Sequence, residues 1–343
     1  MASTSTSPNN VPKANLYTFK ASVWGAVATI GLVEKGYAPD DVDLRSVVLP
    51  KGENFAPAYL RINPNATVPS LVVPLADTTS AEVDTKFRAL NDSVAVLEFL
   101  DSSRSQQILD ARGETGTAPA PMLAPATIEG KAASDALIAL VHHDDADPNG
   151  LLLAVRDEKE LEAAVKGFHG TFVKGRFEAL KTYRAETAAQ AKGPNPRDAA
   201  ITERLLNWYD ERLLADAPLY NTFIAGDSTA QKAFIEQSIN LWVGLAKVLS
   251  TLEERLVGPL ALGDQIALAD IHLMAYLARI FQVAQSLPYA PKGDEISAVD
   301  AAFKHPAIAA KVTNAAVGPK VAAYWQALKQ RPSFKHEYAD GLH

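Results

Sequence analysis

Hydrophobic and polar positions follow two different rhythms along this chain, and the change falls near residue 110. Before that point, short β-branched or apolar runs alternate with apolar segments of helical length. The pattern predicts strands over 15–19, 41–48, 70–73 and 87–90 and helices over 22–35, 57–62 and 93–101. This βαβ-α-ββα order predicts a layer of helices on a four-stranded sheet.

After residue 125 no stretch has the pattern of a strand, and apolar positions recur at three- and four-residue steps. Between Ile235 and Leu256 they form a stripe of the kind that faces a core. The pattern predicts helices over 128–142, 158–191, 201–214, 231–257, 268–285 and 321–329. Breaks at 147–150, 192–196 and 286–293 are predicted to be turns or surface loops, because they are rich in turn-forming residues.

The two halves together predict an α+β fold. We expect a thioredoxin-like domain over residues 14–109, followed by an all-helical domain with insertions over residues 126–343. Residues 110–125 are rich in Gly, Pro and Ala and predict a linker. The polar, uncharged start of the chain predicts a disordered extension over residues 1–13.

Composition excludes several classes of function. The net charge is −7, from 33 basic and 40 acidic residues, so charge gives no support for nucleic-acid binding. Cysteine is absent, which excludes disulfides, thiolate metal sites and a cysteine nucleophile. Any thiol in the chemistry must therefore come from a ligand.

Targeting and membrane signals are also missing from the sequence. Residues 1–10 contain no apolar signal core, and the most apolar run, 268–284, is interrupted by Asp270, His272 and Arg279. We therefore expect a cytoplasmic protein with no membrane partner.

Two junctions between loops and elements are candidates for ligand binding. The loop 63–67 leads into a strand through Val68-Pro69, where a cis bond would turn the Val68 backbone polar groups towards a ligand. Asp92-Ser93 opens a helix, and backbone donors with a hydroxyl at a helix N-terminus favour a carboxylate. Glutathione has both a peptide edge and a carboxylate, and so would satisfy both junctions.

Five motifs lie in order on the expected elements. They are Leu16-Tyr17-Thr18 with Ser22, Asn63-Pro64-x4-Pro69-x-Leu71, Asp92-Ser93 with Val96-Leu97-x-Phe99-Leu100-Asp101, Gly263-Asp264-x5-Asp270-Ile271, and Trp325-x5-Arg331-Pro332. Each is weak alone, but their order is specific, and on them the chain resembles the glutathione transferases over most of its length. Residues 143–153 resemble an insertion found in some fungal members with an enlarged helical domain.

The resemblance implies conjugation of the glutathione thiolate to hydrophobic electrophiles, a detoxification-like transferase reaction with glutathione as co-substrate and no metal. It also implies a homodimer with a two-fold interface. The absence of cysteine excludes the cysteine-based thiol transferases of this superfamily. The alternative is a binding or regulatory protein, such as a ligand carrier, that keeps the fold but turns over little.

Ser22 is the predicted catalytic residue, since it stands where serine-type members have their hydroxyl. A free thiol of pKa near 8.5 is only roughly 3% ionised at neutral pH, and a hydroxyl donor at a helix N-terminus can raise that fraction. A helix cap is the alternative interpretation of Ser22. Tyr17 is the alternative catalytic residue, although an aromatic side chain in a strand more often packs on the sheet.

The resemblance also assigns the glutathione contacts. Asp92 is expected to bind the ammonium and Ser93 the carboxylate of the γ-glutamyl end, although the family more often has Glu or Gln where Asp92 stands. The glycyl carboxylate is commonly bound by a Lys or His, but the aligned residue is Phe55, so Lys51 and Asn54 are the candidate substitutes.

Two further features are predicted to be structural. The family usually has Ser or Thr where Ala267 stands, and the loss of that helix cap costs roughly 1 kcal/mol, while Asp270 can still face the helix N-terminus. The run of His and Asp over residues 142–147 lacks the spacing of metal ligands, so no metal site is expected there.

Overall fold

The computed structural model describes residues 13–74, 87–111, 113, 118–190, 196–288 and 290–343, and its N-terminal part is built on a four-stranded sheet. The strands are β1 (Ala14–Thr18), β2 (Val42–Ser46), β3 (Ser70–Pro74) and β4 (Phe87–Leu90), in the order β2-β1-β3-β4. β2 is parallel to β1, whereas β3 is antiparallel to both of its neighbours. The predicted α+β class and the thioredoxin-like sheet are confirmed.

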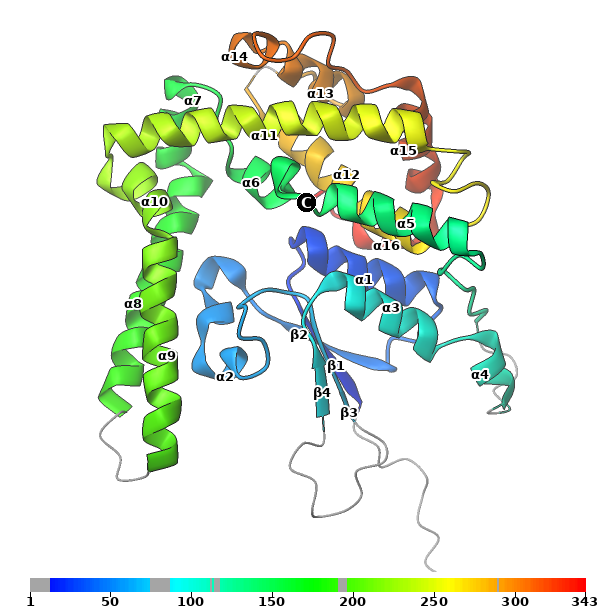
Figure 1. Ribbon diagram of the computed structural model, residues 1–343, viewed down its shortest axis with the longest axis horizontal. Helices are drawn as coiled ribbons and strands as arrows, with labels where there is room; N and C mark the ends of the chain where they lie inside the picture. Colours follow the sequence, from blue (N-terminus) through cyan, green and yellow to red (C-terminus); the bar gives the residue numbers. More distant parts are fainter. Residues whose placement is uncertain (1–12, 75–86, 112, 114–117, 191–195, 289) are drawn as a thin grey trace, which may run out of the picture.

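Helices α1 (Val23–Glu34) and α3 (Ser93–Ser103) lie between this sheet and the helical part of the molecule (Figure 1). α1 is apolar almost all round because both of its sides are buried. Ala28 packs with the sheet, whereas Val27 and Ile30 belong to the core that α1 shares with the helical part. Burial on two sides explains why α1 has no polar stripe.

The helical part surrounds one buried helix, α12 (Leu268–Ser286), whose Leu273, Tyr276 and Phe281 are fully buried. The other helices are α4 (Gln106–Ala111), α5 (Ile128–Val141), α6 (Pro148–Leu153), α7 (Glu158–Lys166), α8 (Phe168–Gln190), α9 (Pro196–Ala215), α10 (Ala217–Tyr220), α11 (Ser228–Arg255), α13 (Glu295–Phe303), α14 (Pro306–Ala309), α15 (Pro319–Gln330) and α16 (Pro332–Glu337). Within the described ranges, no helix is both long and apolar enough to cross a bilayer.

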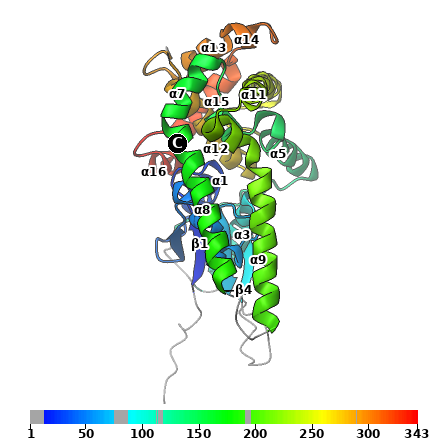
Figure 2. The same ribbon diagram turned by 90° about the vertical axis from the view of Figure 1, so that its left-hand side faces the viewer.

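Helices α8 and α9 form a long hairpin that stands beside the N-terminal domain (Figures 1 and 2). It packs on the short helix α2 (Pro57–Leu60) and on the 3₁₀ turn before it, Glu53–Phe55. Tyr209 donates its hydroxyl hydrogen to the Phe55 carbonyl at 2.7 Å, and the Trp208 Nε1 donates to the Pro64 carbonyl at 2.8 Å. The hairpin therefore contacts the segment that leads to Val68.

Two predicted elements of the helical part are corrected. The single helix expected over 158–191 is interrupted at Gly167, whose ψ of −148° is incompatible with a continuous helix, so that α7 and α8 are separate. The turn expected at 147–150 is instead the start of α6, because Asp147 caps the amides of Asn149 and Gly150 and Pro148 occupies the first helical position. The predicted turn at 192–195 and the N-terminal extension up to residue 12 lie outside the described residues.

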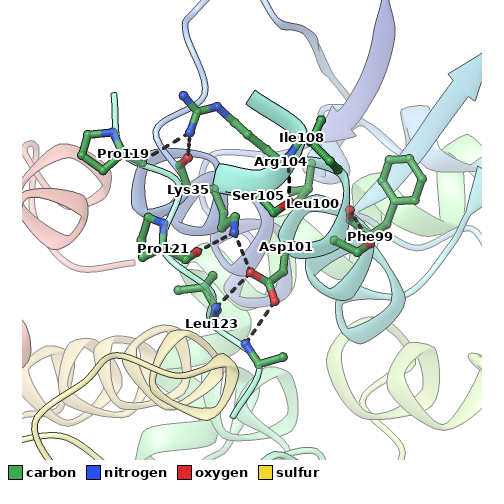
Figure 3. Close-up of polar contacts among 12 residues, drawn as sticks. Lys35, Phe99, Leu100, Asp101, Arg104, Ser105, Ile108, Pro119, Pro121 and Leu123 are labelled. Atoms are coloured by element: carbon green, nitrogen blue, oxygen red, sulfur yellow. Dashed lines mark hydrogen bonds and ion pairs between the residues drawn. The ribbon is translucent and has the colours of Figure 1, made fainter. Parts of the chain in front are cut away.

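Residues 118–124, in the second half of the predicted linker, are held against the N-terminal domain by a buried polar network (Figure 3). Lys35 is fully buried and pairs with the Asp101 carboxylate at 2.7 Å. Asp101 also accepts from the amides of Leu123 and Ala124, and the Lys35 Nζ donates to the Pro121 carbonyl. Arg104 donates to backbone carbonyls of Lys35, Ala118 and Pro119.

Asp270 makes the half of the capping box at the start of α12 that does not depend on the side chain of Ala267. Its carboxylate accepts from the amides of Ala261 and Ala267 at 2.8 and 2.7 Å and from the Tyr324 hydroxyl at 2.8 Å. Burial raises the pKa of Asp270 above its usual value, in opposition to these three hydrogen bonds. Asp270 thus faces the N-terminus of α12, as its position in the motif predicts.

Candidate functional site

The strand register brings the predicted junctions to one edge of the sheet. Tyr17, near the end of β1, pairs with Ser70 at the start of β3, and Leu71 pairs with Leu90 at the end of β4. The turn after β1, the loop before β3 and the turn after β4 therefore meet at the same edge. These three segments contain Ser22, Val68 and Asp92-Ser93.

Ser22 is the N-cap of α1. Its Oγ accepts from the Gly25 amide at 3.1 Å, and the residue is 9% exposed. The hydroxyl hydrogen is still available, because a serine oxygen that accepts one bond can also donate one. Gly25 leaves room for two hydroxyls, since a Cβ there would lie 2.5 Å from the Thr18 Oγ1 and 3.2 Å from the Ser22 Oγ.

Tyr17 lies on the sheet, packed against the Tyr59 ring. The two ring centroids are 5.9 Å apart with an interplanar angle of 64°, in a cluster with Val47 and Val68. This edge-to-face contact is the ordinary packing of a strand aromatic. The structure thus places Ser22 at the helix terminus and Tyr17 in the packing beside it.

The loop before β3 is fixed by side chains of the preceding helix and turn. Val68-Pro69 is a cis peptide, and Val68 is 7% exposed. The fully buried Asn63 donates to the Thr67 carbonyl at 2.8 Å and to the Ser70 Oγ at 3.0 Å. Tyr59 donates to the same Thr67 carbonyl at 2.6 Å. The motif Asn63-Pro64 pointed to this loop, but sequence reasoning missed Tyr59.

Asp92 and Ser93 differ in how accessible they are. Asp92 is exposed and caps α3, with its Oδ1 accepting from the Ala95 amide at 2.8 Å. One carboxylate oxygen therefore holds the helix, and the other is available to a ligand. Ser93 is 4% exposed at the first position of α3.

The two candidates for the glycyl carboxylate are in different environments. Asn54 is 3% exposed, and its Nδ2 donates to the Ala66 carbonyl at 2.8 Å, so its side chain holds the loop before Val68. Lys51 is exposed. Phe55 is fully buried under the Arg176 guanidinium, which lies 4.5 Å from the ring centroid.

A histidine pair that sequence reasoning missed lies where α1 meets the helical part. The His142 Nε2 is 2.9 Å from the His272 Nδ1, and the Trp24 ring stacks on His142 at 3.8 Å between centroids. Burial lowers the pKa of His142 to about 4, against the opposing effect of the Asp92 carboxylate, and burial also lowers the pKa of His272 well below its usual value. Both imidazoles are therefore neutral at physiological pH. His142 and His272 are 130 positions apart, so no local pattern could have paired them.

Arg279 is the second residue that the sequence did not identify. It lies in α12, is 2% exposed, and donates from Nη2 to the Ala21 carbonyl at 2.6 Å. In the sequence it was visible only as an interruption of an apolar run. Among the described residues, no group of three or more His, Cys, Asp or Glu side chains is arranged to bind a metal ion.

Comparisons with known proteins agree with this architecture. Residues 21–103 match the glutathione S-transferase N-terminal domain family. The structure of Gtt2 from Saccharomyces cerevisiae matches with a TM-score of 0.51 at 17% identity, over 94% of this chain and 99% of that one. Glutathione transferase F2 from Populus trichocarpa gives a TM-score of 0.49 at 14% identity, over 95% and 98% of the two chains. No curated protein sequence matches the chain. At these identities, the likeness to Gtt2 shows the fold.

Proposed function

We propose that the chain is a member of the glutathione transferase superfamily, because residues 21–103 match the N-terminal domain family and the fold is that of Gtt2. We propose that it binds glutathione and conjugates the thiolate to hydrophobic electrophiles. The observation that supports this most directly is the meeting of three junctions at one sheet edge. The N-terminus of α1 with the Ser22 hydroxyl, the Val68 backbone and the N-terminus of α3 lie together there.

Ser22 is the proposed activating residue. Its hydroxyl hydrogen donates to the glutathione sulfur, and the first-turn amides of α1 add positive potential. Both favour loss of the thiol proton to water. The thiolate then attacks the electrophilic carbon, the new C–S bond forms, and the leaving group departs with its electron pair.

We propose that glutathione lies along this edge of the sheet, with its γ-glutamyl end at the start of α3 and its glycyl end at Lys51. The γ-glutamyl carboxylate accepts from the Ser93 hydroxyl and amide, and the ammonium pairs with the free oxygen of Asp92. The Val68 backbone, next to Pro69, pairs with the middle of the peptide. The exposed Lys51 is the proposed partner of the glycyl carboxylate, because the Asn54 side chain already holds the Ala66 carbonyl.

Two measurements test this proposal and separate it from the alternative, a ligand carrier. Calorimetry should show glutathione binding, and a generic aromatic electrophile should be consumed with glutathione by the same preparation. Glutathione binding without turnover would support the carrier, for which the capping role of the Ser22 Oγ is the favouring observation. Absence of glutathione binding would contradict the proposed transferase.

We further propose a cytoplasmic homodimer with a detoxification-like role. In the family interface, the N-terminal domain of one subunit meets the helical domain of the other. Here the hairpin of α8 and α9 already covers part of the N-terminal domain, so a dimer must use the surface that the hairpin leaves free. Sedimentation that shows only a 36.7 kDa species at micromolar concentration would contradict the dimer.

A further inference from the structure

Arg279 places a positive charge against the turn that leads into Ser22. Only 2% of the residue is exposed, and its Nη2 is 2.6 Å from the Ala21 carbonyl oxygen. Two covalent bonds separate the Ala21 carbonyl carbon from the Ser22 Cα. A cation from the helical part is thus fixed at the first turn of α1.

This guanidinium has no ion-pair partner in the part of the chain that the structure describes. Its Nε is buried with no acceptor among the described residues, and the Tyr338 hydroxyl and the Asp147 carboxylate are the groups that act on it electrostatically. Arg156, which is also buried, does pair with a carboxylate, that of Glu160. Burial lowers the pKa of Arg279 to about 10, so the group is still charged at neutral pH. A buried charge without a partner is costly.

We propose that Arg279 is a positioning residue for the conjugation reaction: it fixes the Ala21–Ser22 turn and stabilises the glutathione thiolate. The inference rests on the proposed function, which places the sulfur at Ser22. When the thiol loses its proton to water, the sulfur becomes the negative counter-charge that the guanidinium lacks. Attraction between opposite charges is stronger in a partly buried site than in bulk water, so the cation favours the ionised form.

The two groups that act on Arg279 do not cancel its charge. Among the described residues, Asp147 forms no ion pair with Arg279, and its carboxylate instead accepts hydrogen bonds from two amides at the start of α6. Burial raises the pKa of Tyr338 well above its ordinary value, so its hydroxyl is neutral.

The elements packed on α1 add little further charge to the site. Lys20 and Asp340 pair with each other on the exposed side of the turn, and Glu337 of α16 accepts from the Thr29 hydroxyl at 2.6 Å. His272 of α12 is neutral because burial lowers its pKa. Asp92, at the start of α3, is solvent-exposed and assigned to the glutathione ammonium.

The test is the pKa of the bound glutathione thiol, read from the ultraviolet absorbance of the thiolate across a pH series. Arg279→Gln keeps a donor for the Ala21 carbonyl but removes the charge, whereas Arg279→Lys keeps the charge. Arg104→Gln is the matched control, because the buried Arg104 also donates to a backbone carbonyl next to α1. Its acceptor is the carbonyl of Lys35, the C-cap residue at the opposite end of the helix from Ser22.

We expect Arg279→Gln to raise the thiol pKa by about one unit, with an about tenfold loss of kcat/KM at neutral pH that is recovered at higher pH. Arg279→Lys should stay within a few tenths of a unit of the wild type, and Arg104→Gln should lower thermal stability without moving the thiol pKa.

The inference is overturned if folded Arg279→Gln keeps the wild-type thiol pKa, or if Arg104→Gln raises it equally. It also fails if Arg279→Gln unfolds under conditions in which Arg104→Gln stays folded, since Arg279 would then be structural. A wild-type protein that binds no glutathione contradicts the proposed function instead, before any variant is compared.

Discussion

Removing the Asp101 carboxylate should destabilise the protein more than removing its partner Lys35. Asp101→Ala leaves a fully buried ammonium whose remaining described acceptor is the Pro121 carbonyl. It also leaves the amides of Leu123 and Ala124 without their acceptor (Figure 3). Lys35→Met leaves the carboxylate, which keeps both of those amide donors.

The magnitude follows from what each variant leaves unpaired. Breaking a buried ion pair from one side typically costs about 3–5 kcal/mol, and a buried amide without an acceptor costs about 1–3 kcal/mol. These terms overlap, so we expect a loss of about 4–5 kcal/mol for Asp101→Ala. For Lys35→Met we expect about 2–3 kcal/mol, below the usual range, because two amides still stabilise the carboxylate. The double variant should cost clearly less than the sum of the two.

The assay is guanidinium unfolding followed by tryptophan fluorescence and by circular dichroism. Coincident transitions would show that the two parts of the molecule unfold together and that one free energy of unfolding is defined. A loss below about 1 kcal/mol for Asp101→Ala, or a larger loss for Lys35→Met, would refute the reasoning, because the buried amine would then have found another acceptor or water.

Other expected outcomes concern catalysis and acid stability. Ser22→Ala should lower turnover at neutral pH by about one to two orders of magnitude with little change in glutathione affinity; full activity in Ser22→Ala together with loss in Tyr17→Phe would assign catalysis to the tyrosine. The unfolded chain takes up protons on its histidines below about pH 6.5. The folded protein resists this protonation at His142 down to about pH 4, and also at His272, whose pKa burial lowers well below its usual value. The stability that these two neutral histidines contribute is therefore present above pH 6.5 and is lost as the pH falls towards 4. His272→Asn should therefore flatten a plot of melting temperature against pH. The control variant His143→Gln, at an exposed histidine, should leave the slope of that plot unchanged.

The parts of this fold that the sequence predicts are those set by local chemistry. Ser22 and Asp92 are favoured caps, and both open a helix in the structure. The apolar pattern also identified the strands and the buried helix α12. Local rules could still mislead, because Asp147-Pro148 is favourable both in a turn and at the start of a helix, and here the pair begins α6.

The rest of the site depends on contacts between distant segments. Arg279 contacts Ala21 across 258 positions, and no spacing rule reaches that far. Asn54 was a candidate for ligand binding because of its residue type, yet its amide is used to hold the Ala66 carbonyl. Residue type predicts which hydrogen bonds a side chain can make, whereas only the packed chain decides which of them are made.

The hairpin of α8 and α9 also affects the order in which parts of the chain can fold. Trp208 and Tyr209 hold carbonyls that lie 144 and 154 positions earlier, in the segment that leads to Val68. Such long-range contacts form only after a large loop has closed, which is entropically costly and slows folding. During synthesis, the sheet can therefore form well before the peptide-binding edge reaches its final shape. A ribosome-bound chain that ends near residue 125 would contain Ser22 and Val68 but would lack the hairpin contacts that support the loop before Val68.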